Sequence, residues 1–263
     1  MRVAVVGLGE AGSIYATDLL ARGASVVGTD LHVTTASAGV VIAADIPAVV
    51  RGADLVLSLV GASSAADVLD EALPAMDAAA IFVDMNTSGP DHKARLAARA
   101  AERGFPFVDA AILAPVPRAR IDTPLLLSGP AVERLIPLLQ ELGIPATDVG
   151  PEAGAAARLK LLRSIFMKGL AAVVMESVNA AEVFGAQDWL IDQISSELGA
   201  SGRGAVQHLI DGTTKHAVRR EIEMVEARDF LDSMEAPHPM TDGTIEWLRA
   251  IAAQRTDREI SHR

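Results

Sequence analysis

The sequence contains no cysteine and very few aromatic side chains. The absence of cysteine excludes disulfide bonds, zinc–thiolate sites, iron–sulfur clusters and a cysteine nucleophile. Phe, Trp and Tyr together make up 3% of the 263 residues, which argues against a surface that stacks nucleic-acid bases. Apart from His216, which is discussed below, the histidines show no metal-ligand spacing, and we expect no bound metal.

Basic side chains are outnumbered by acidic ones. The 23 Lys and Arg residues against 34 Asp and Glu residues give a net charge of −11, which disfavours nucleic acid and anionic membranes as partners. No apolar run approaches the roughly 18 residues of a membrane span. Residues 1–2 lead into a strand pattern rather than a signal peptide. With 50% apolar residues, the chain is expected to be a folded cytoplasmic protein of one or two domains.

Short β-rich runs alternate with helical segments over residues 1–150. The apolar run Val3–Val6 is closed by glycine, as expected for a strand buried on both faces. The alternation predicts a doubly wound parallel sheet of the Rossmann type, covered by helices on both faces. Further strands are expected at about 25–29, 54–60, 80–84, 106–109 and 125–127, and helices at about 12–22, 63–77 and 91–103.

The β-type runs vanish after residue 150. Helical periodicity takes over, which predicts an α/β domain at 1–150, an all-helical domain at 151–255 and a flexible tail at 256–263. The helices are expected at about 153–184, 188–198, 203–211, 214–234 and 241–253.

A glycine-rich turn follows the first predicted strand and opens a helix. Gly7 permits a tight turn, Gly9 lets the backbone approach a pyrophosphate, and Gly12 allows close helix–strand packing. The amino end of the helix offers free N–H groups and its positive dipole end to phosphates. Glycine-rich turns end many buried strands, but this context predicts dinucleotide binding. The predicted contacts are Gly7, Leu8, Gly9, Glu10, Ala11 and Gly12.

An acidic residue, Asp30, ends the second predicted strand eighteen residues after Gly12. A carboxylate there can accept hydrogen bonds from the adenosine ribose and repels a 2′-phosphate, which favours NAD and leaves NADP possible. The alternative is a turn aspartate that precedes His32.

Four segments in this order resemble the β-hydroxyacid dehydrogenase family, which includes 3-hydroxyisobutyrate dehydrogenase and 6-phosphogluconate dehydrogenase. The resemblance is to a less characterised bacterial branch, and it implies a Rossmann-type domain followed by an all-α domain. The second segment, residues 84–90, looks like the family's Asp-x-Ser/Thr-Thr element, which lies near the nicotinamide of the cofactor. The alternative is that Thr87 or Ser88 is a helix N-cap. The segments are residues 7–12, 84–90, 107–116 and 154–164, and the further implied cofactor contacts are Val60, Asn86 and Thr87.

The third and fourth segments depart from the family pattern. Leu113, Ala114 and Pro115 stand where the family has Ser-Gly-Gly, so a hydroxyl and one N–H donor to a substrate carboxylate are lost. Arg163 and Ser164 replace two asparagines that follow the catalytic lysine. The resemblance implies substrate contacts by Leu113, Ala114, Arg163 and Ser164.

Lys160 coincides with the family's catalytic lysine. Hydride transfer to or from a carbonyl group needs a proton-transfer group, and a lysine performs this role when burial or a neighbouring cation lowers its pKa. Lys160, Arg163 and Ser164 share one helix face, which we expect to point at the cleft between the domains. The alternative is a solvated lysine whose stem covers apolar surface.

His216 and Arg219 form a second candidate substrate cluster. An arginine placed in the cleft could hold a carboxylate bidentately. The alternative is a solvated helix face on which Arg219 pairs with Glu223.

The leading hypothesis is an NAD(P)-dependent dehydrogenase that transfers hydride between nicotinamide and a small hydroxy acid or its keto form. Reduction of C=N bonds by an imine reductase is the first alternative, although that group usually lacks the lysine. A non-catalytic NAD sensor is the second. The helical domain is small, so we expect a homodimer, with this domain supplying substrate and dimer contacts.

Overall fold

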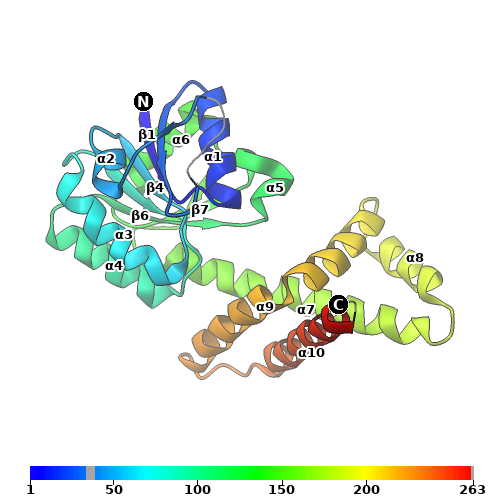
Figure 1. Cartoon of the computed structure of the whole chain (residues 1–263). Helices are drawn as coiled ribbons and strands as arrows, with labels where there is room; N and C mark the ends of the chain where they lie inside the picture. Colours follow the sequence, from blue (N-terminus) through cyan, green and yellow to red (C-terminus); the bar gives the residue numbers. More distant parts are fainter. Residues whose placement is uncertain (34–38, 262–263) are drawn as a thin grey trace. The chain divides into compact units, whose positions relative to one another are not determined.

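The computed structural model describes residues 1–33 and 39–261 (Figure 1). The chain forms two compact units, Met1–Lys160 and the residues from Leu161 onward. The first unit combines a sheet with helices, and the second contains only helices within its described residues. This order confirms the predicted fold class.

An eight-stranded sheet forms the centre of the first unit, with the order β3-β2-β1-β4-β5-β6-β7-β8. All neighbours are parallel except β6 and β7, which are antiparallel. The strands are β1 Arg2–Val6, β2 Ser25–Thr29, β3 Val41–Ile42, β4 Leu55–Ser58, β5 Ile81–Asp84, β6 Phe107–Ile112, β7 Leu125–Ser128 and β8 Ala146–Asp148.

The antiparallel β7 corrects the prediction of a parallel sheet. The connection from β6 to β7 holds only the one-turn helix α5 (Val116–Ala119) and the 3-10 turn η3 (Arg120–Asp122). A four-residue helix is about 6 Å long, too short to carry the chain back along the sheet for a parallel strand. The chain therefore returns beside β6 in the opposite direction.

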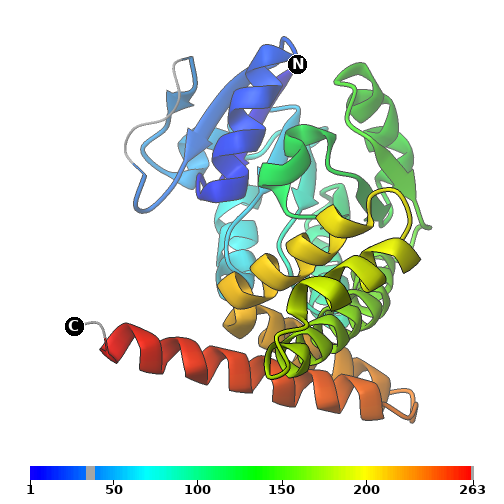
Figure 2. The same ribbon diagram turned by 90° about the vertical axis from the view of Figure 1, so that its right-hand side faces the viewer.

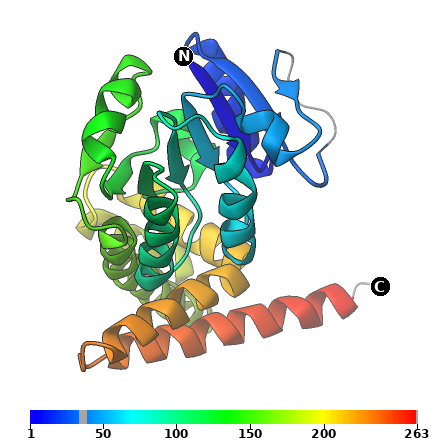
Figure 3. The same cartoon turned by 90° about the vertical axis from the view of Figure 1, so that its left-hand side faces the viewer.

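Helices cover both faces of this sheet, as Figures 1 and 3 show. Successive residues of β1 point to opposite faces, so Val3 packs in one core and Ala4 in the other. The first core includes α1 (Glu10–Ala21) and α6 (Val132–Glu141). The second core is covered by α2 (Ile46–Val50), α3 (Ala65–Ala72) and α4 (Pro90–Glu102), and two further 3-10 turns are η1 (Ala62–Ser64) and η2 (Leu73–Ala75).

Four helices account for the rest of the described chain. The two helices predicted at 203–211 and 214–234 form one element with a kink at His216, whose φ of −123° and ψ of 25° are not helical. α10 packs along α9 (Figures 2 and 3) and runs to Ser261, while residues 262 and 263 of the predicted flexible tail lie outside the described residues. The helices are α7 Ala155–Glu182, α8 Gln187–Glu197, α9 Gly202–Asp232 and α10 Pro239–Ser261.

No helix within the described ranges is both long and apolar enough to cross a membrane.

His238 joins the end of α9 to the start of α10. Its Nε2 lies 2.8 Å from Asp232 Oδ1, and its Nδ1 lies 2.9 Å from Asp242 Oδ2. The pKa of His238 is raised above its ordinary value, chiefly by the hydrogen bond to Asp232, with Asp242 adding to the effect. The two carboxylates therefore favour the charged imidazolium.

We expect His238 to stabilise the protein below about pH 6.5, its ordinary pKa, and to lose this effect as pH rises through its raised pKa. The reason is that the folded chain binds the proton more tightly than the unfolded chain. The measurement is the melting temperature of the wild type and His238→Gln between pH 5.5 and 8.5. Both tryptophans, Trp189 and Trp247, lie in the second unit and provide the fluorescence signal. A gap between the two melting curves that does not change with pH would contradict the expectation.

Candidate functional site

The glycine-rich turn between β1 and α1 is built so that only glycine fits at two positions. Gly7 has a φ of +94°, and a Cβ there would lie 2.4 Å from the Leu59 carbonyl oxygen. A Cβ on Gly12 would lie 1.8 Å from the Gly7 carbonyl oxygen. Gly9, the N-cap of α1, would meet no described atom within 4 Å, so the open side of the turn lies there. This open turn at a helix amino end fits the pyrophosphate of a dinucleotide.

Asp30 closes the glycine-rich turn from the side of β2. Its Oδ2 accepts a 2.7 Å hydrogen bond from the Leu8 N–H, and its Oδ1 accepts from the N–H groups of His32 and Val33 at 2.8 and 3.1 Å. Burial raises the pKa of Asp30, but the three backbone donors together outweigh it, so the pKa lies below its usual value. Asp30 therefore makes the turn contacts that the sequence left as an alternative, and contact with a ribose remains a prediction.

The segment after β5 holds two buried oxygen atoms without a partner among the described residues, Asn86 Oδ1 and Ser88 Oγ. Buried polar atoms are normally hydrogen-bonded, so such atoms at the carboxyl edge of the sheet suit a ligand that carries amide or hydroxyl donors. Val60 lies at the other side of the turn, with its Cγ1 3.0 Å from the position of a Gly7 Cβ. These features fit a nicotinamide dinucleotide along the edge.

Lys93 is a buried cation that the sequence analysis missed. Its side chain is 1% exposed, and its Nζ lies 3.1 Å from Asp84 Oδ2 and 3.1 Å from Asp109 Oδ1, both of which belong to fully buried side chains. Nζ also donates to the Asp84 carbonyl oxygen at 2.9 Å. Asp84, the last residue of β5, and Asp109, within β6, are register partners, so without Lys93 two carboxylates would face each other across neighbouring strands.

The start of α7 is fixed to this buried ion cluster. Asp109 Oδ2 accepts hydrogen bonds from the Ala157 N–H and the Ser128 hydroxyl, each at 3.1 Å. Ser128 Oγ accepts the Ala156 N–H at 3.0 Å. Gly154, with a φ of +99°, approaches Pro90 so closely that a Cβ would lie 2.6 Å from the Pro90 carbonyl oxygen. The first turn of α7 thus has a fixed place at the sheet edge.

Lys160 lies one turn further along α7 and meets the segment after β5. Its Nζ donates a 3.0 Å hydrogen bond to Thr87 Oγ1. The structure therefore brings together two residues that the sequence analysis selected separately, seventy-three positions apart in the chain. Lys160 is half-buried and Thr87 is exposed, so this polar pair is accessible at the edge that also carries Asn86.

The loop after β6 presents apolar side chains. Leu113 and Ala114 are half-buried, and the Leu113 N–H is engaged with the Pro124 carbonyl oxygen at 3.1 Å. Arg120 has a positive φ of 54°, and its guanidinium binds the Asp18 carboxylate of α1. The loop is held through Arg120 and Asp18, and it offers neither the hydroxyl nor the chain of free N–H groups of the Ser-Gly-Gly pattern.

In the second unit, the structure links Ser164 to Arg219 through two further residues. Lys168 Nζ donates to Ser164 Oγ at 3.0 Å and lies 2.7 Å from Glu223 Oε2. Arg219 Nε lies 3.8 Å from Glu223 Oε1, which is the helix-surface pair left open by the sequence. Arg163 is exposed, and the half-buried His216 forms the kink of α9.

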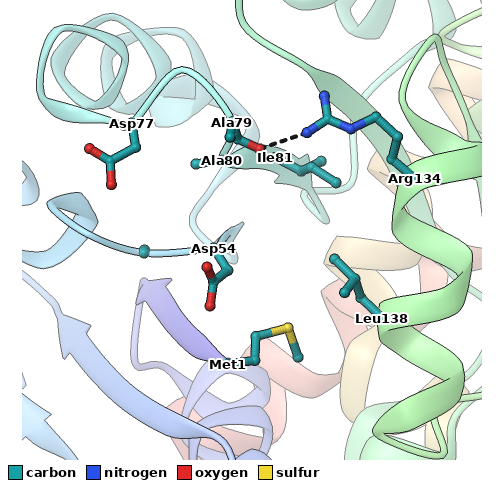
Figure 4. Close-up of a pocket in the computed structure, with 9 residues that line it drawn as sticks. Met1, Asp54, Asp77, Ala79, Ala80, Ile81, Arg134 and Leu138 are labelled. Carbon is teal, nitrogen blue, oxygen red and sulfur yellow. Dashed lines mark hydrogen bonds between the residues drawn. The ribbon is translucent and has the colours of Figure 1, made fainter.

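A hollow of about 400 Å³ lies at the opposite ends of the strands, beside the amino ends of β4 and β5 (Figure 4). The Arg134 guanidinium is bound to the Ala79 carbonyl oxygen at 2.7 Å, and Asp54 Oδ2 accepts the Arg2 N–H at 2.7 Å. Ligands of open α/β sheets bind beyond the carboxyl ends of the strands. The hollow is therefore not the candidate site.

Sequence comparison divides the chain in the same order. Residues 2–150 match the NAD-binding domain of 6-phosphogluconate dehydrogenase, and residues 181–251 match a domain of unknown function, DUF1932. A protein of Methanothermus fervidus, described as an uncharacterized 28.5 kDa protein, is 30% identical over 193 residues, which cover 73% of this chain and 74% of that protein.

Two solved structures share the fold over nearly the whole chain. A conserved hypothetical protein from Sinorhizobium meliloti is 30% identical with a TM-score of 0.74, and the match covers 95% of this chain and 88% of that one. The 3-hydroxyisobutyrate dehydrogenase of Mycobacterium tuberculosis is 21% identical with a TM-score of 0.80, covering 96% and 94%. At that identity, the second likeness shows the fold alone.

We expect Gly12→Ala to weaken NADH binding at least about tenfold, because the new methyl group would displace the Gly7 carbonyl and open the turn. The measurement is a titration of NADH fluorescence. Gly61→Ala is the matched control, since Gly61 has an ordinary φ of −73° and a Cβ there would come no closer than 3.8 Å to another atom. Equal affinity in the two variants would contradict the role of the turn.

Proposed function

The chain belongs to the family that carries the NAD-binding domain of 6-phosphogluconate dehydrogenase, and from that premise we propose that it is an NAD-dependent dehydrogenase of small hydroxy acids. The observation that carries the proposal is the 3.0 Å contact between Lys160 Nζ and Thr87 Oγ1. It supports a proton-transfer role for Lys160 at the carboxyl ends of the strands, where the glycine-rich turn would take the pyrophosphate and Asn86 would lie near the nicotinamide.

When bound, the nicotinamide ring supplies the acceptor or donor of the hydride. Lys160 would take the proton of the substrate hydroxyl during oxidation and return it to the carbonyl oxygen during reduction. Thr87 accepts one hydrogen bond from Lys160 Nζ, which limits the directions in which the amine can turn. The half-buried position of Lys160 keeps part of its side chain out of water and holds the group in one place.

We propose NAD rather than NADP as the preferred cofactor. Asp30 supports this choice, because its carboxylate, whose pKa lies below its ordinary value, is charged at neutral pH. A charged carboxylate beside the ribose repels a 2′-phosphate.

Substrate contacts are proposed from both units. Leu113 and Ala114 would contact the apolar part of the substrate, which suits a loop without its hydroxyl. The polar contacts proposed in the second unit are Arg163, Ser164, His216 and Arg219. An arginine pairs with a carboxylate bidentately, and a hydroxy acid offers such a carboxylate.

Lys160→Met should lower kcat by about 10²- to 10⁴-fold, the usual contribution of a general acid–base group, while NADH affinity stays within about threefold. Arg158→Met is the control: it removes a cation two residues earlier, which is about 200° around the helix. The measurement is absorbance at 340 nm with NAD or NADP and a panel of 2- and 3-hydroxy acids, and in reverse with keto acids and cyclic imines.

Each outcome of this panel decides between the functions. Full activity of Lys160→Met would overturn the proposed mechanism. Turnover only on cyclic imines would favour a C=N reductase, the second candidate, which the apolar Leu113–Pro115 segment supports. NADH binding without turnover on any substrate would favour a sensor.

We also propose a homodimer formed through the second unit. This unit exposes large apolar side chains that a water-soluble monomer would normally cover. Examples with at least half of the side chain exposed are Phe166, Val173, Val183, Phe184, Trp189 and Ile222.

Light scattering after size exclusion should give twice the mass of 27.4 kDa at about 10 μM, a concentration at which interfaces of ordinary affinity are filled. Phe184→Glu combined with Trp189→Glu should shift the protein toward the monomer, because buried carboxylates are unfavourable. Leu31→Glu combined with Val41→Glu adds the same two charges to exposed positions of the first unit and should leave the mass unchanged. A monomeric wild type would contradict the proposal.

A further inference from the structure

We propose that Lys93 is a positioning residue that fixes Lys160 against Thr87. The proposal concerns the geometry of the site named above, and its catalytic consequence rests on the proposed function. Lys93 itself is 1% exposed and belongs to the buried part of α4, so it has no access to a substrate.

One chain of contacts runs from Lys93 to the backbone beside Thr87. Lys93 binds Asp84 through Oδ2 and through the carbonyl oxygen. The other carboxylate oxygen, Oδ1, accepts the Asn86 N–H at 3.1 Å and the Asn86 Nδ2 at 2.5 Å. Asp84 therefore holds the backbone of the residue that directly precedes Thr87.

A second chain of contacts runs from Lys93 to the helix that carries Lys160. Lys93 binds Asp109 Oδ1, while Asp109 Oδ2 accepts the Ala157 N–H. Ala157 and Lys160 are three residues apart, so they lie on neighbouring turns of one face of α7. A single ammonium group thus connects the two backbone segments that carry Thr87 and Lys160.

The charges of the cluster allow its positioning role to be separated from charge neutralisation. Lys93, Asp84 and Asp109 together carry one net negative charge, and Asp109 also faces the positive amino end of α7. Lys93→Met alone would leave two buried carboxylates unpaired. The double variant Lys93→Met with Asp84→Asn keeps the net charge of the cluster at minus one, and the new amide oxygen can still accept from Asn86.

The absence of cysteine gives a direct measurement of the geometry. Thr87→Cys introduces the one thiol of the chain next to Lys160 Nζ, where a nearby ammonium group favours the thiolate. The pH dependence of the rate of alkylation by iodoacetamide should then give a thiol pKa at least about one unit below its ordinary 8.5. Adding Lys160→Met should return it to the ordinary value, which shows that Lys160 is the cause.

In the Thr87→Cys background, the charge-matched double variant should also bring the thiol pKa back toward about 8.5, because Lys160 is no longer held in place. Arg95→Met is the control, since it removes an exposed cation from the same helix. In the protein that keeps its native Thr87, the double variant should lower kcat at least about tenfold and leave NADH affinity within about threefold. A role in folding alone would not produce this separation of kcat from cofactor affinity.

A low thiol pKa that persists in the charge-matched variant would overturn the proposal, and so would unchanged kcat. Failure of both Lys93 variants to fold would overturn it in favour of a purely structural role. The thiol measurement needs no substrate, so a wild type without turnover would contradict only the proposed function, while the thiol result would still decide the role of Lys93.

Discussion

The buried ion cluster of Lys93, Asp84 and Asp109 is the constraint on which the first unit depends. The two aspartates are register partners on the neighbouring strands β5 and β6, which lie about 4.8 Å apart. One ammonium group pairs with both carboxylates, and removing a partner from such a buried pair typically costs about 3–5 kcal/mol. Because the remaining carboxylate oxygens bind Asn86 and Ala157, the same charges that would destabilise the sheet edge also set its geometry.

Contacts within the protein also fix the backbone of the glycine-rich turn. Gly7 and Gly12 leave no room for a Cβ, and Asp30 accepts the Leu8 N–H. The backbone of the turn is thus held before any ligand arrives, as a phosphate site at a helix amino end requires. After β5, Asn86 Oδ1 and Ser88 Oγ are buried without partners in the described part of the chain, so these atoms suit a ligand that carries hydrogen-bond donors. Pre-arranged donors and acceptors reduce what binding must reorganise.

Much of the fold was predictable from local pattern. The continuous apolar strands, the helices on both faces and the change to an all-helical unit follow from hydrophobic periodicity, which acts over a few residues. The antiparallel β7 was not predicted, because strand direction depends on how far α5 can carry the chain. α6 was also missed, since Pro137 interrupts its pattern, although Leu135 and Leu139 bury the helix against the sheet. The burial of Lys93 could have been predicted from its spacing, because it shares the buried face of α4 with Leu96 and Ala100. Two predicted strands also end in aspartate, which indicates possible partners for its charge.

The sequence by itself determined the candidate residues of the site: a turn that only glycine can make, an acidic residue after β2, and a lysine where a similar family has its catalytic lysine. These depend on local sterics and on the chemistry of single side chains. Only the tertiary structure decided that Lys160 meets Thr87, that Asp30 supports the turn, and that Lys93 joins two strands to α7. Such contacts link residues that are distant in the chain, and the burial that makes each one strong or costly exists only once the sheet and its helices have packed.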